Sequence, residues 1–258
     1  MKYISSTDNP LIKELKQLRD SRYRKKRGLY VAEGENCAFE ALKRNVRPRQ
    51  VIASEDLREN SLLAEFSAKG TTPVLCTRRC FRKFTDTQSQ TGIALVLETP
   101  SFTEEALPAS GVILCACGIQ DPGNMGTLIR TAEALGASAV YAIEPCAGIR
   151  NPKTVRSSSG SVLDFPVFSG SASGALRAFS AISATLVAGI PSGGVSPEDA
   201  EYGDPTVVVI GNEARGVRSE IMAQVYQRIS VPIRGRAESL NAAAAGAIHL
   251  YEVLRKPR

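Results

Sequence analysis

The sequence predicts an α/β protein in which a smaller α/β domain precedes a larger one built on a mostly parallel sheet with helices on both faces. Beyond residue 111, continuous apolar runs alternate with helical patterns, which is typical of strands that are buried on both faces of a sheet. Before residue 98, apolar runs and helical patterns also alternate, but they are shorter. A length of 258 residues suits one large domain or two ordinary ones, and the change of pattern favours two.

The first domain is expected over residues 1–98. Its opening helix is predicted at residues 11–20, because Leu11, Leu15 and Leu18 recur at helical spacing. The later elements are a strand at 29–31, a helix at 35–42, a strand at 51–53, a helix at 56–69, and strands at 74–76 and 93–97. Residues 99–110 contain two prolines and no clear periodicity, so they are expected to form a linker.

The second domain is expected over residues 111–258. It opens with the continuous apolar run 112–117, which favours a strand buried on both faces. The later predicted elements are a helix at 124–135, strands at 139–143, 185–190, 206–210 and 229–233, and a last helix at 239–254.

The composition excludes several classes of protein. Hydrophobic residues make up 43% and charged residues 22% of the chain, which argues against wholesale disorder and against a fibrous protein. No stretch approaches the ~18 apolar residues needed to span a bilayer, and the first residues lack the apolar segment of a signal peptide. Six cysteines without an export signal are expected to be reduced thiols. We therefore expect a cytoplasmic protein that has no membrane partner.

The net charge of +6 is unevenly distributed along the chain. Residues 1–98 hold 19 Lys and Arg against 12 Asp and Glu, whereas residues 99–258 hold 13 against 14. This asymmetry predicts a first domain that binds a polyanion. The densest basic run consists of Arg19, Arg22, Arg24, Lys25, Lys26 and Arg27. Such a run is often only a solvated face, but Tyr23 and the arginines further along favour contact with an RNA or DNA backbone.

Three loops rich in glycine or asparagine each follow a predicted strand, at the edge where open α/β sheets bind ligands. The first loop spans residues 120–130. Asn124 is a candidate N-cap of the next helix, and the free amides there favour an anion such as a phosphate. Helical side chains lean towards the N-terminus, so Arg130 can reach over Gly126 to the mouth of the loop. A lone arginine here is also compatible with a solvent-exposed helix position.

The second loop spans residues 209–217. Gly211 and Gly216 would let the backbone approach a ligand closely, and the carboxylate of Glu213 can orient a hydrogen-bond donor. A two-glycine turn alone is compatible with a simple strand-to-helix connection. The chain contains neither the dinucleotide-binding glycine pattern nor a Walker loop.

The third loop spans residues 231–241, and it precedes the last helix. Ser239 is a candidate N-cap, which would place Leu240 and Asn241 at the mouth of that helix. The small residues at 242–246 allow close packing, either within the core or across a dimer.

Metal chemistry is not expected. The single histidine, His249, lies late on the last predicted helix, so neither a histidine-based triad nor a facial metal site is expected, and His249 is expected to be structural or interfacial. No two cysteines have the two-residue gap of a zinc or redox site.

The three loops, in this order and spacing, resemble the SpoU (TrmH) family of RNA ribose 2′-O-methyltransferases, within the SPOUT class. The matching motifs are Asn124-x-Gly126-x-x-x-Arg130, Gly211-x-Glu213-x-x-Gly216, and Val231-Pro232-Ile233 with Ser239-Leu240-Asn241. The segments 4–13, 23–24 and 31–34 look like the ribosomal-protein-L30e-like substrate domain of the family, and members so arranged are most similar to ribosomal RNA methyltransferases. One departure is Ala242, where many members have valine.

The resemblance implies a C-terminal trefoil knot, S-adenosylmethionine as the cofactor, and a homodimer. It implies a cofactor pocket lined by Gly211, Val231, Ile233 and Leu240. It implies active-site roles for Asn124, Arg130, Glu213, Ser239 and Asn241, with Arg130 near the cofactor of the other subunit or at the shared cleft. Arg130 is a general base in accounts of the family, but a guanidinium stays protonated in proteins, which favours a role in gripping a phosphate.

The predicted function is methyl transfer to a ribose 2′-OH of structured RNA. The separate first domain favours ribosomal RNA, and its predicted RNA contacts are Arg22, Arg24, Lys25, Lys26 and Arg27. The alternatives are the same chemistry on transfer RNA, or a non-catalytic RNA-binding or ribosome-assembly factor with this fold. The second alternative predicts decayed site residues, whereas Arg130, Glu213, Ser239 and Asn241 are all present.

Overall fold

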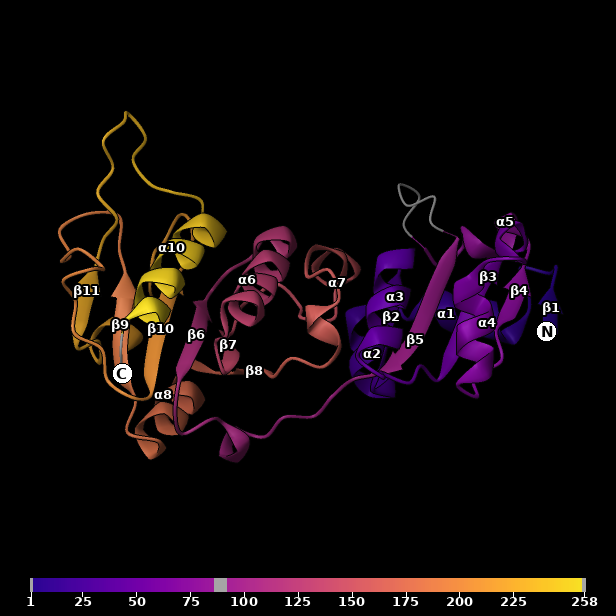
Figure 1. The fold of residues 1–258 in the computed structure, drawn as a ribbon, viewed down its shortest axis with the longest axis horizontal. Coiled ribbons are helices and arrows are strands. Elements are labelled where there is room, and N and C mark those ends of the chain that lie inside the picture. The colour runs from indigo at the N-terminus through magenta and orange to yellow at the C-terminus, as the bar shows by residue number, and fades with distance from the viewer. Residues whose placement is uncertain (1, 86–91, 257–258) are drawn as a thin grey trace. The chain divides into compact units, whose positions relative to one another are not determined.

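The structure is a computed structural model that describes residues 2–85 and 92–256 (Figure 1). The chain divides into two compact units. The first unit contains residues 1–100 together with 150–164, and the second contains residues 101–149 and 165–258. None of the helices in the described ranges has both the length and the apolar character needed to cross a bilayer.

The first unit is built on a mixed five-stranded sheet with the strand order β1-β4-β3-β5-β2. The strands are β1 (Lys2–Ile4), β2 (Leu29–Glu33), β3 (Gln50–Ser54), β4 (Val74–Cys76) and β5 (Ile93–Glu98). The helices are α1 (Pro10–Gln17), α2 (Ser21–Arg27), α3 (Glu35–Lys43), η1 (Glu55–Leu57), α4 (Ser61–Ala68), α5 (Arg78–Phe81), α7 (Pro152–Ser157) and η3 (Ser161–Leu163). Strand β5 runs antiparallel to β2 and β3, whereas β4 runs parallel to β1 and β3.

The helix expected at residues 11–20 is two helices. The Asn9 side chain caps α1, which ends at Gln17, and the Asp20 side chain accepts a hydrogen bond from the Tyr23 amide to start α2. The basic run therefore forms a helix of its own, and Gly28 (φ 63°) ends it. The helix expected at 56–69 is likewise divided, because Asn60 caps α4 and the preceding turn η1 is separate.

Residues 150–164 belong to the first unit although the flanking sequence belongs to the second. Helix α7 packs against β2. The Arg150 guanidinium lies 5.0 Å from the centre of the Tyr30 ring, and Arg44 Nη1 lies 2.6 Å from Asp164 Oδ1. These contacts join residues that are more than a hundred positions apart, so local patterns in the sequence do not indicate them.

The second unit is built on a six-stranded sheet, parallel throughout, with the order β11-β9-β10-β6-β7-β8. The strands are β6 (Val112–Cys117), β7 (Ala139–Ile143), β8 (Val167–Gly170), β9 (Thr185–Gly189), β10 (Thr206–Gly211) and β11 (Gln227–Ile229). The helices are η2 (Glu104–Ala106), α6 (Pro122–Leu135), α8 (Ala172–Ala181), α9 (Ser219–Met222) and α10 (Ala242–Arg255).

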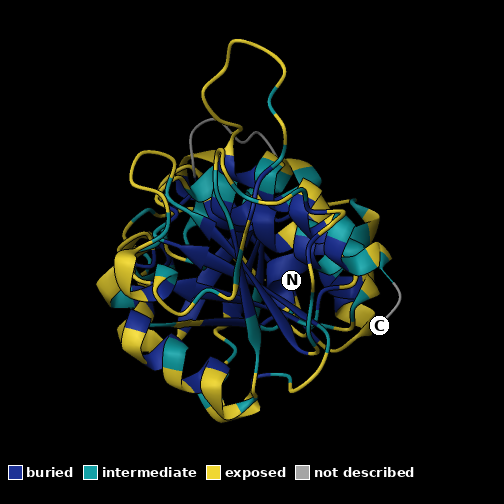
Figure 2. Ribbon diagram, turned by 90° about the vertical axis from the view of Figure 1, so that its left-hand side faces the viewer, coloured by how far each residue is buried: buried dark blue, intermediate teal, exposed yellow. Residues whose placement is uncertain are grey.

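Helices cover both faces of this sheet, as the sequence predicts. Helix α8 contributes Ala175 and Phe179 to a core cluster with Tyr141 and Val209. Helices α6 and α10 pack against each other over β6 and β10 on the opposite face. A Cβ on Gly246 would lie 2.4 Å from Leu128 Cδ2, so this glycine lets α10 approach α6 closely. Figure 2 shows that the strands are buried and that the outer sides of the helices are exposed.

Both helix starts near the predicted site differ from the sequence-based expectation. The N-cap of α6 is Asp121, whose carboxylate accepts a hydrogen bond from the Asn124 amide, and Pro122 is the first helical residue. The N-cap of α10 is Asn241 instead of Ser239, because its side-chain oxygen accepts from the Ala243 and Ala244 amides. The strand expected at 229–233 ends at Ile229, which leaves 230–233 irregular beside the site.

Candidate active site

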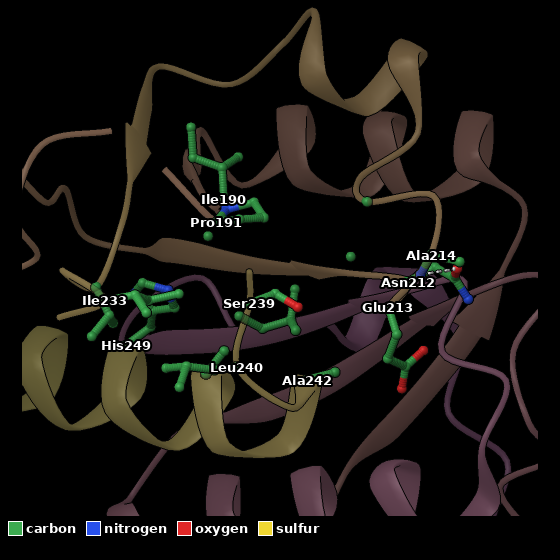
Figure 3. Close-up of a pocket in the computed structure, with 16 residues that line it drawn as sticks. Ile190, Pro191, Asn212, Glu213, Ala214, Ile233, Ser239, Leu240, Ala242 and His249 are labelled. Carbon is green, nitrogen blue, oxygen red and sulfur yellow. Dashed lines mark hydrogen bonds between the residues drawn. The ribbon is translucent and has the colours of Figure 1, made fainter. Parts of the chain in front are cut away.

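A pocket lies at the carboxyl ends of β9 and β10, the edge at which parallel α/β sheets bind ligands (Figure 3). It encloses about 760 Å³ of space, part of which is open solvent. Its lining comes from four segments that are distant in the sequence: residues 189–191, 210–216, 231–240 and the first turns of α10.

Most of the predicted site residues meet here. Gly211, Val231, Ile233 and Leu240, which were expected to bind the cofactor, all line the pocket. Glu213 and Ser239, which were expected to be active-site residues, line it too. The second and third motifs therefore share one cavity.

Gly211 occupies a position that only glycine fits. A Cβ there would lie 2.3 Å from the carbonyl carbon of Gly216, because the loop folds back on itself. Asn212 and Gly216 exchange two backbone hydrogen bonds of 3.0 and 2.8 Å that close this loop. The close turn places Glu213 at the tip of the loop.

Asn212 is a site residue that the sequence-based reasoning missed. Its side-chain oxygen accepts hydrogen bonds from the amides of Ala214 and Arg215, and its amide nitrogen donates to the carbonyl of Gly118 at 2.9 Å. Asn212 therefore shapes the loop and ties it to the end of β6. An Asn directly after a strand and before a turn is a recognisable signal for this role.

A chain of side-chain hydrogen bonds joins the three motifs. The Asn241 oxygen accepts from the amides of Ala243 and Ala244, so its amide group points outward and donates to Asn124 Oδ1 at 3.0 Å. The amide of Asn124 in turn donates to Glu213 Oε1 at 2.5 Å. Because each amide can donate only from its nitrogen, the helix cap fixes the orientation of both asparagines and of the carboxylate.

Arg130 does not line the pocket. Its side chain is exposed on α6, one helical turn beyond Gly126. Thus eight of the nine predicted site residues either line the pocket or are hydrogen-bonded to Glu213 or Asn124.

In the first unit, Arg24 does not fit its predicted role as an RNA contact. Its side chain is buried, and Nη1 donates to the carbonyls of Leu18 and Arg19 at 2.9 and 2.7 Å. Burial lowers the pKa of Arg24. It therefore holds the corner between α1 and α2, because the carbonyls at the end of α1 need a donor.

The other basic residues of the run are exposed. Arg27 pairs with Glu14 at 2.7 Å, and Arg22, Lys25 and Lys26 point to solvent on α2. These exposed side chains are available to a polyanion.

A second basic feature of the first unit was missed by the sequence-based reasoning. A pocket enclosing about 530 Å³ is lined by Arg19, Lys153 and Arg156 beside the buried carboxylate of Glu33. Arg156 Nη1 lies 3.6 Å from Glu33 Oε2. Three cations against one anion leave the pocket positive, and α7 supplies two of these cations from a distant part of the chain.

The six cysteines are unpaired thiols. Five of them are buried, and burial raises the pKa of Cys37 to about 11 and that of Cys76 to about 12. Within residues 2–85 and 92–256, no group of three or more His, Cys, Asp or Glu side chains is placed to hold a metal ion.

Comparison with known proteins gives concordant matches to both parts of the chain. The model of the SpoU rRNA Methylase family matches residues 111–251, and that of the MRM3-like substrate binding domain matches residues 9–94. The 23S rRNA (guanosine(2553)-2′-O)-methyltransferase RlmP of Bacillus subtilis is 30% identical over 253 residues, which cover 98% of this chain and 99% of that protein.

Solved structures agree. An AdoMet-bound rRNA methyltransferase from Sinorhizobium meliloti is 25% identical with a TM-score of 0.87, over 98% of this chain and 97% of the other. A crystal structure of an RNA 2′-O ribose methyltransferase is 27% identical with a TM-score of 0.83, over 98% of each chain.

The parallel sheet, the pocket at its strand ends and these relatives define the class, which is that of S-adenosylmethionine-dependent RNA methyltransferases. The chain belongs to the SpoU rRNA methylase family, which confirms the family resemblance of its motifs.

The pocket suits S-adenosylmethionine. Ile190, Val231 and Leu240 supply apolar walls for a flat base, and Gly211 lets the backbone come close to a ligand. One buried polar atom of the wall, His249 Nδ1, has no hydrogen-bond partner among the described residues.

Proposed function

We propose that the protein transfers the methyl group of S-adenosylmethionine to a ribose 2′-OH of structured ribosomal RNA, with the pocket at β9 and β10 as the reaction centre. The observation that carries this assignment is the hydrogen-bonded chain Asn241–Asn124–Glu213 beside the pocket. It joins the three family motifs through their polar side chains, whereas a non-catalytic protein with the same fold would not need these hydrogen bonds.

Positioning is the main contribution of the protein to this reaction. Bound S-adenosylmethionine supplies an electrophilic methyl group. The attacking oxygen has to lie in line behind the methyl carbon, and holding it there supplies much of the acceleration. The Glu213 carboxylate, oriented by Asn124, is placed to accept a hydrogen bond from a ribose hydroxyl, and the apolar walls exclude water from the donor.

Arg130 acts in this scheme on the RNA backbone and not as a base. A guanidinium stays protonated in proteins, so it cannot take the proton of the 2′-OH. It can bind a phosphate through two parallel hydrogen bonds, which would orient the neighbouring ribose. Its exposure on α6, on the helix that begins beside Asn124, suits contact with a large substrate. In a homodimer, the phosphate that it holds would belong to RNA bound at the shared cleft.

The first unit supplies contacts to the RNA backbone. The exposed cations Arg22, Lys25 and Lys26 and the positive pocket of Arg19, Lys153 and Arg156 support this role. Such contacts carry little sequence information, so RNA shape selects the target. The similarity to RlmP over the whole chain favours ribosomal RNA over transfer RNA.

Three further features belong to the proposal: an L30e-like fold for the first unit, a trefoil knot in the second, and a cytoplasmic homodimer. Exposed large apolar residues of α10, Ile248 and Tyr251, support a covered face in a dimer. Light scattering of the purified protein tests the dimer.

The proposed function is tested by incubating the protein with labelled S-adenosylmethionine and separated cellular RNAs: naked ribosomal RNA, ribosomal subunits and transfer RNA. Nuclease digestion and mass mapping then locate 2′-O-methylated nucleosides. We expect label in ribosomal RNA, as RNA or within a subunit. Label confined to transfer RNA would shift the substrate, and label in none of the fractions would contradict the proposal.

Asn124→Ala tests the hydrogen-bonded chain in this assay. It removes the link between Asn241 and Glu213 but no helix cap, because Asp121 caps α6. We expect an unchanged melting temperature and at least a tenfold slower single-turnover rate, in line with the usual effect of losing a group that orients reactants. A wild-type rate in this variant would remove the hydrogen-bonded chain from the chemistry.

A further inference from the structure

His249, the only histidine in the chain, lies on α10 and lines the pocket. In Figure 3 its ring lies beside Ile233, at the end of the pocket opposite to Glu213. The sequence alone indicated a structural or interfacial residue. The structure adds that the imidazole lies in the wall of the proposed cofactor site.

The ring is closely enclosed. Only 2% of the residue is exposed, and a Cβ on Gly189 would lie 2.7 Å from Nε2 and 2.8 Å from Cδ2. Gly189 ends β9 at the pocket, so the absence of a side chain there makes room for the imidazole. A side chain at position 189 would therefore overlap the imidazole of His249.

The buried ring lacks a partner. Nδ1 is inaccessible to solvent and makes no hydrogen bond with any described residue. Burial lowers the pKa of His249 to about 4, so the ring is neutral near pH 7, with one nitrogen as donor and the other as acceptor. Buried polar groups in native proteins are almost always paired, and an unpaired one lowers stability. Leucine would fill this position without that cost, so packing alone does not account for a histidine.

We propose that Nε2 of His249, the ring nitrogen beside the pocket residue Gly189, hydrogen-bonds the nucleoside end of the bound methyl donor and thereby contributes to its affinity. This inference rests on the proposed assignment of the pocket to S-adenosylmethionine. The sulfonium of the donor, which joins its nucleoside and amino-acid arms, has to face the RNA ribose near Glu213, so one of the two arms extends towards His249. A purine edge offers both donors and acceptors to a neutral ring, whereas the charged amino-acid end of the donor is poorly suited to this enclosed and uncharged wall.

The test is equilibrium binding of S-adenosylmethionine and S-adenosylhomocysteine by calorimetry, with tag-free protein. His249→Leu keeps the volume and removes both nitrogens, and we expect it to raise the Kd about three- to tenfold, the usual effect of losing one neutral hydrogen bond. Gln places a polar atom near Nε2, so His249→Gln should bind within about twofold of wild type, whereas His249→Asn places one near the enclosed Nδ1 and should bind as weakly as His249→Leu.

Two controls separate binding from packing. We expect His249→Leu to melt at or above the wild-type temperature without ligand, because it removes an unpaired buried group. Leu250→Ala, at a buried neighbour on α10 that does not line the pocket, should lower the melting temperature and leave the Kd unchanged. If the histidine were purely structural, His249→Leu would lower the melting temperature and leave the Kd unchanged.

Nitrogen NMR gives a readout on the unmodified protein. The chain has one imidazole, so its two ¹⁵N signals need no assignment. We expect one of them to shift on addition of S-adenosylhomocysteine. Unshifted signals together with a wild-type Kd for His249→Leu would overturn the inference.

Failure of the inference is distinguishable from failure of the proposed site. Gly211→Val blocks the pocket loop without touching His249. If this variant loses the ligand while His249→Leu keeps it, only the role of His249 is wrong. If Gly211→Val is folded and binds as wild type does, or if the wild type binds no donor, the site assignment itself is wrong.

Discussion

Lowering the pH should destabilise the wild-type protein more than the His249→Leu variant. Burial is the cause of the lowered pKa of His249, which falls from 6.5 to about 4 in the folded protein. The folded value lies below the unfolded one, so the unfolded chain takes up the proton first. The contribution of neutral His249 to the free energy of unfolding is therefore fully present above about pH 6.5, and it is lost as the pH falls towards 4.

The size of this effect follows from the two pKa values. At pH 5 almost every unfolded chain carries the proton on His249 and few folded chains do, which corresponds to about 2 kcal/mol of lost stability. At pH 7 the same difference contributes little. The carboxylates titrate alike in both proteins, so their contribution cancels in the comparison.

The assay is urea unfolding of both proteins at pH 7 and pH 5, followed by circular dichroism. We expect the wild type to lose about 2 kcal/mol more than His249→Leu between these pH values. Losses equal within about 0.5 kcal/mol, comparable to the error of such extrapolations, would show that the ring is solvated in the folded protein.

Three further predictions concern the site and the RNA. Arg130→Lys and Arg130→Ala should weaken RNA binding and slow single-turnover methylation at least tenfold, because lysine cannot form the bidentate contact; unchanged rates in both would remove Arg130 from the chemistry. Gly211→Ala should lower the free energy of unfolding by about 1–3 kcal/mol and weaken cofactor binding, since its Cβ would overlap Gly216; normal values in calorimetry would refute the close turn. Neutralising the exposed cations of α2, which are Arg22, Lys25 and Lys26, should make the salt dependence of the RNA association constant shallower. The slope of the logarithm of that constant against the logarithm of the salt concentration should shrink by ~0.7–0.9 for each phosphate contact that is lost, and an unaltered slope would show that the RNA binds elsewhere.

Much of the second unit could be predicted because its signals are local. Continuous apolar runs such as 112–117 and 206–210 are strands in the structure because burial on both faces demands them. The three motifs could be located because their glycines and asparagines follow such strands directly. Their convergence on one pocket follows from the parallel direction of the strands, which the alternation of apolar runs with helical patterns predicts.

Other features could not be predicted, either because two nearby residues offered the same local signal or because the feature depends on contacts between distant parts of the chain. Asp121 and Asn124 are both good caps, and Pro122 as the first helical residue decides for Asp121. Arg24 looks like its basic neighbours, but the turn after α1 buries it against two carbonyls. His249 shows no local sign of its place in the pocket wall, because Gly189 makes room for it from sixty residues away.

A crystal structure of the full chain with S-adenosylhomocysteine tests the assignment of the site most directly. We expect the ligand between the loop at Gly211, the segment 231–233 and Leu240, with its base towards His249 and its sulfur towards Glu213. Ligand bound at another place, with these three segments not contacting it, would contradict both the site and the chemistry derived from it.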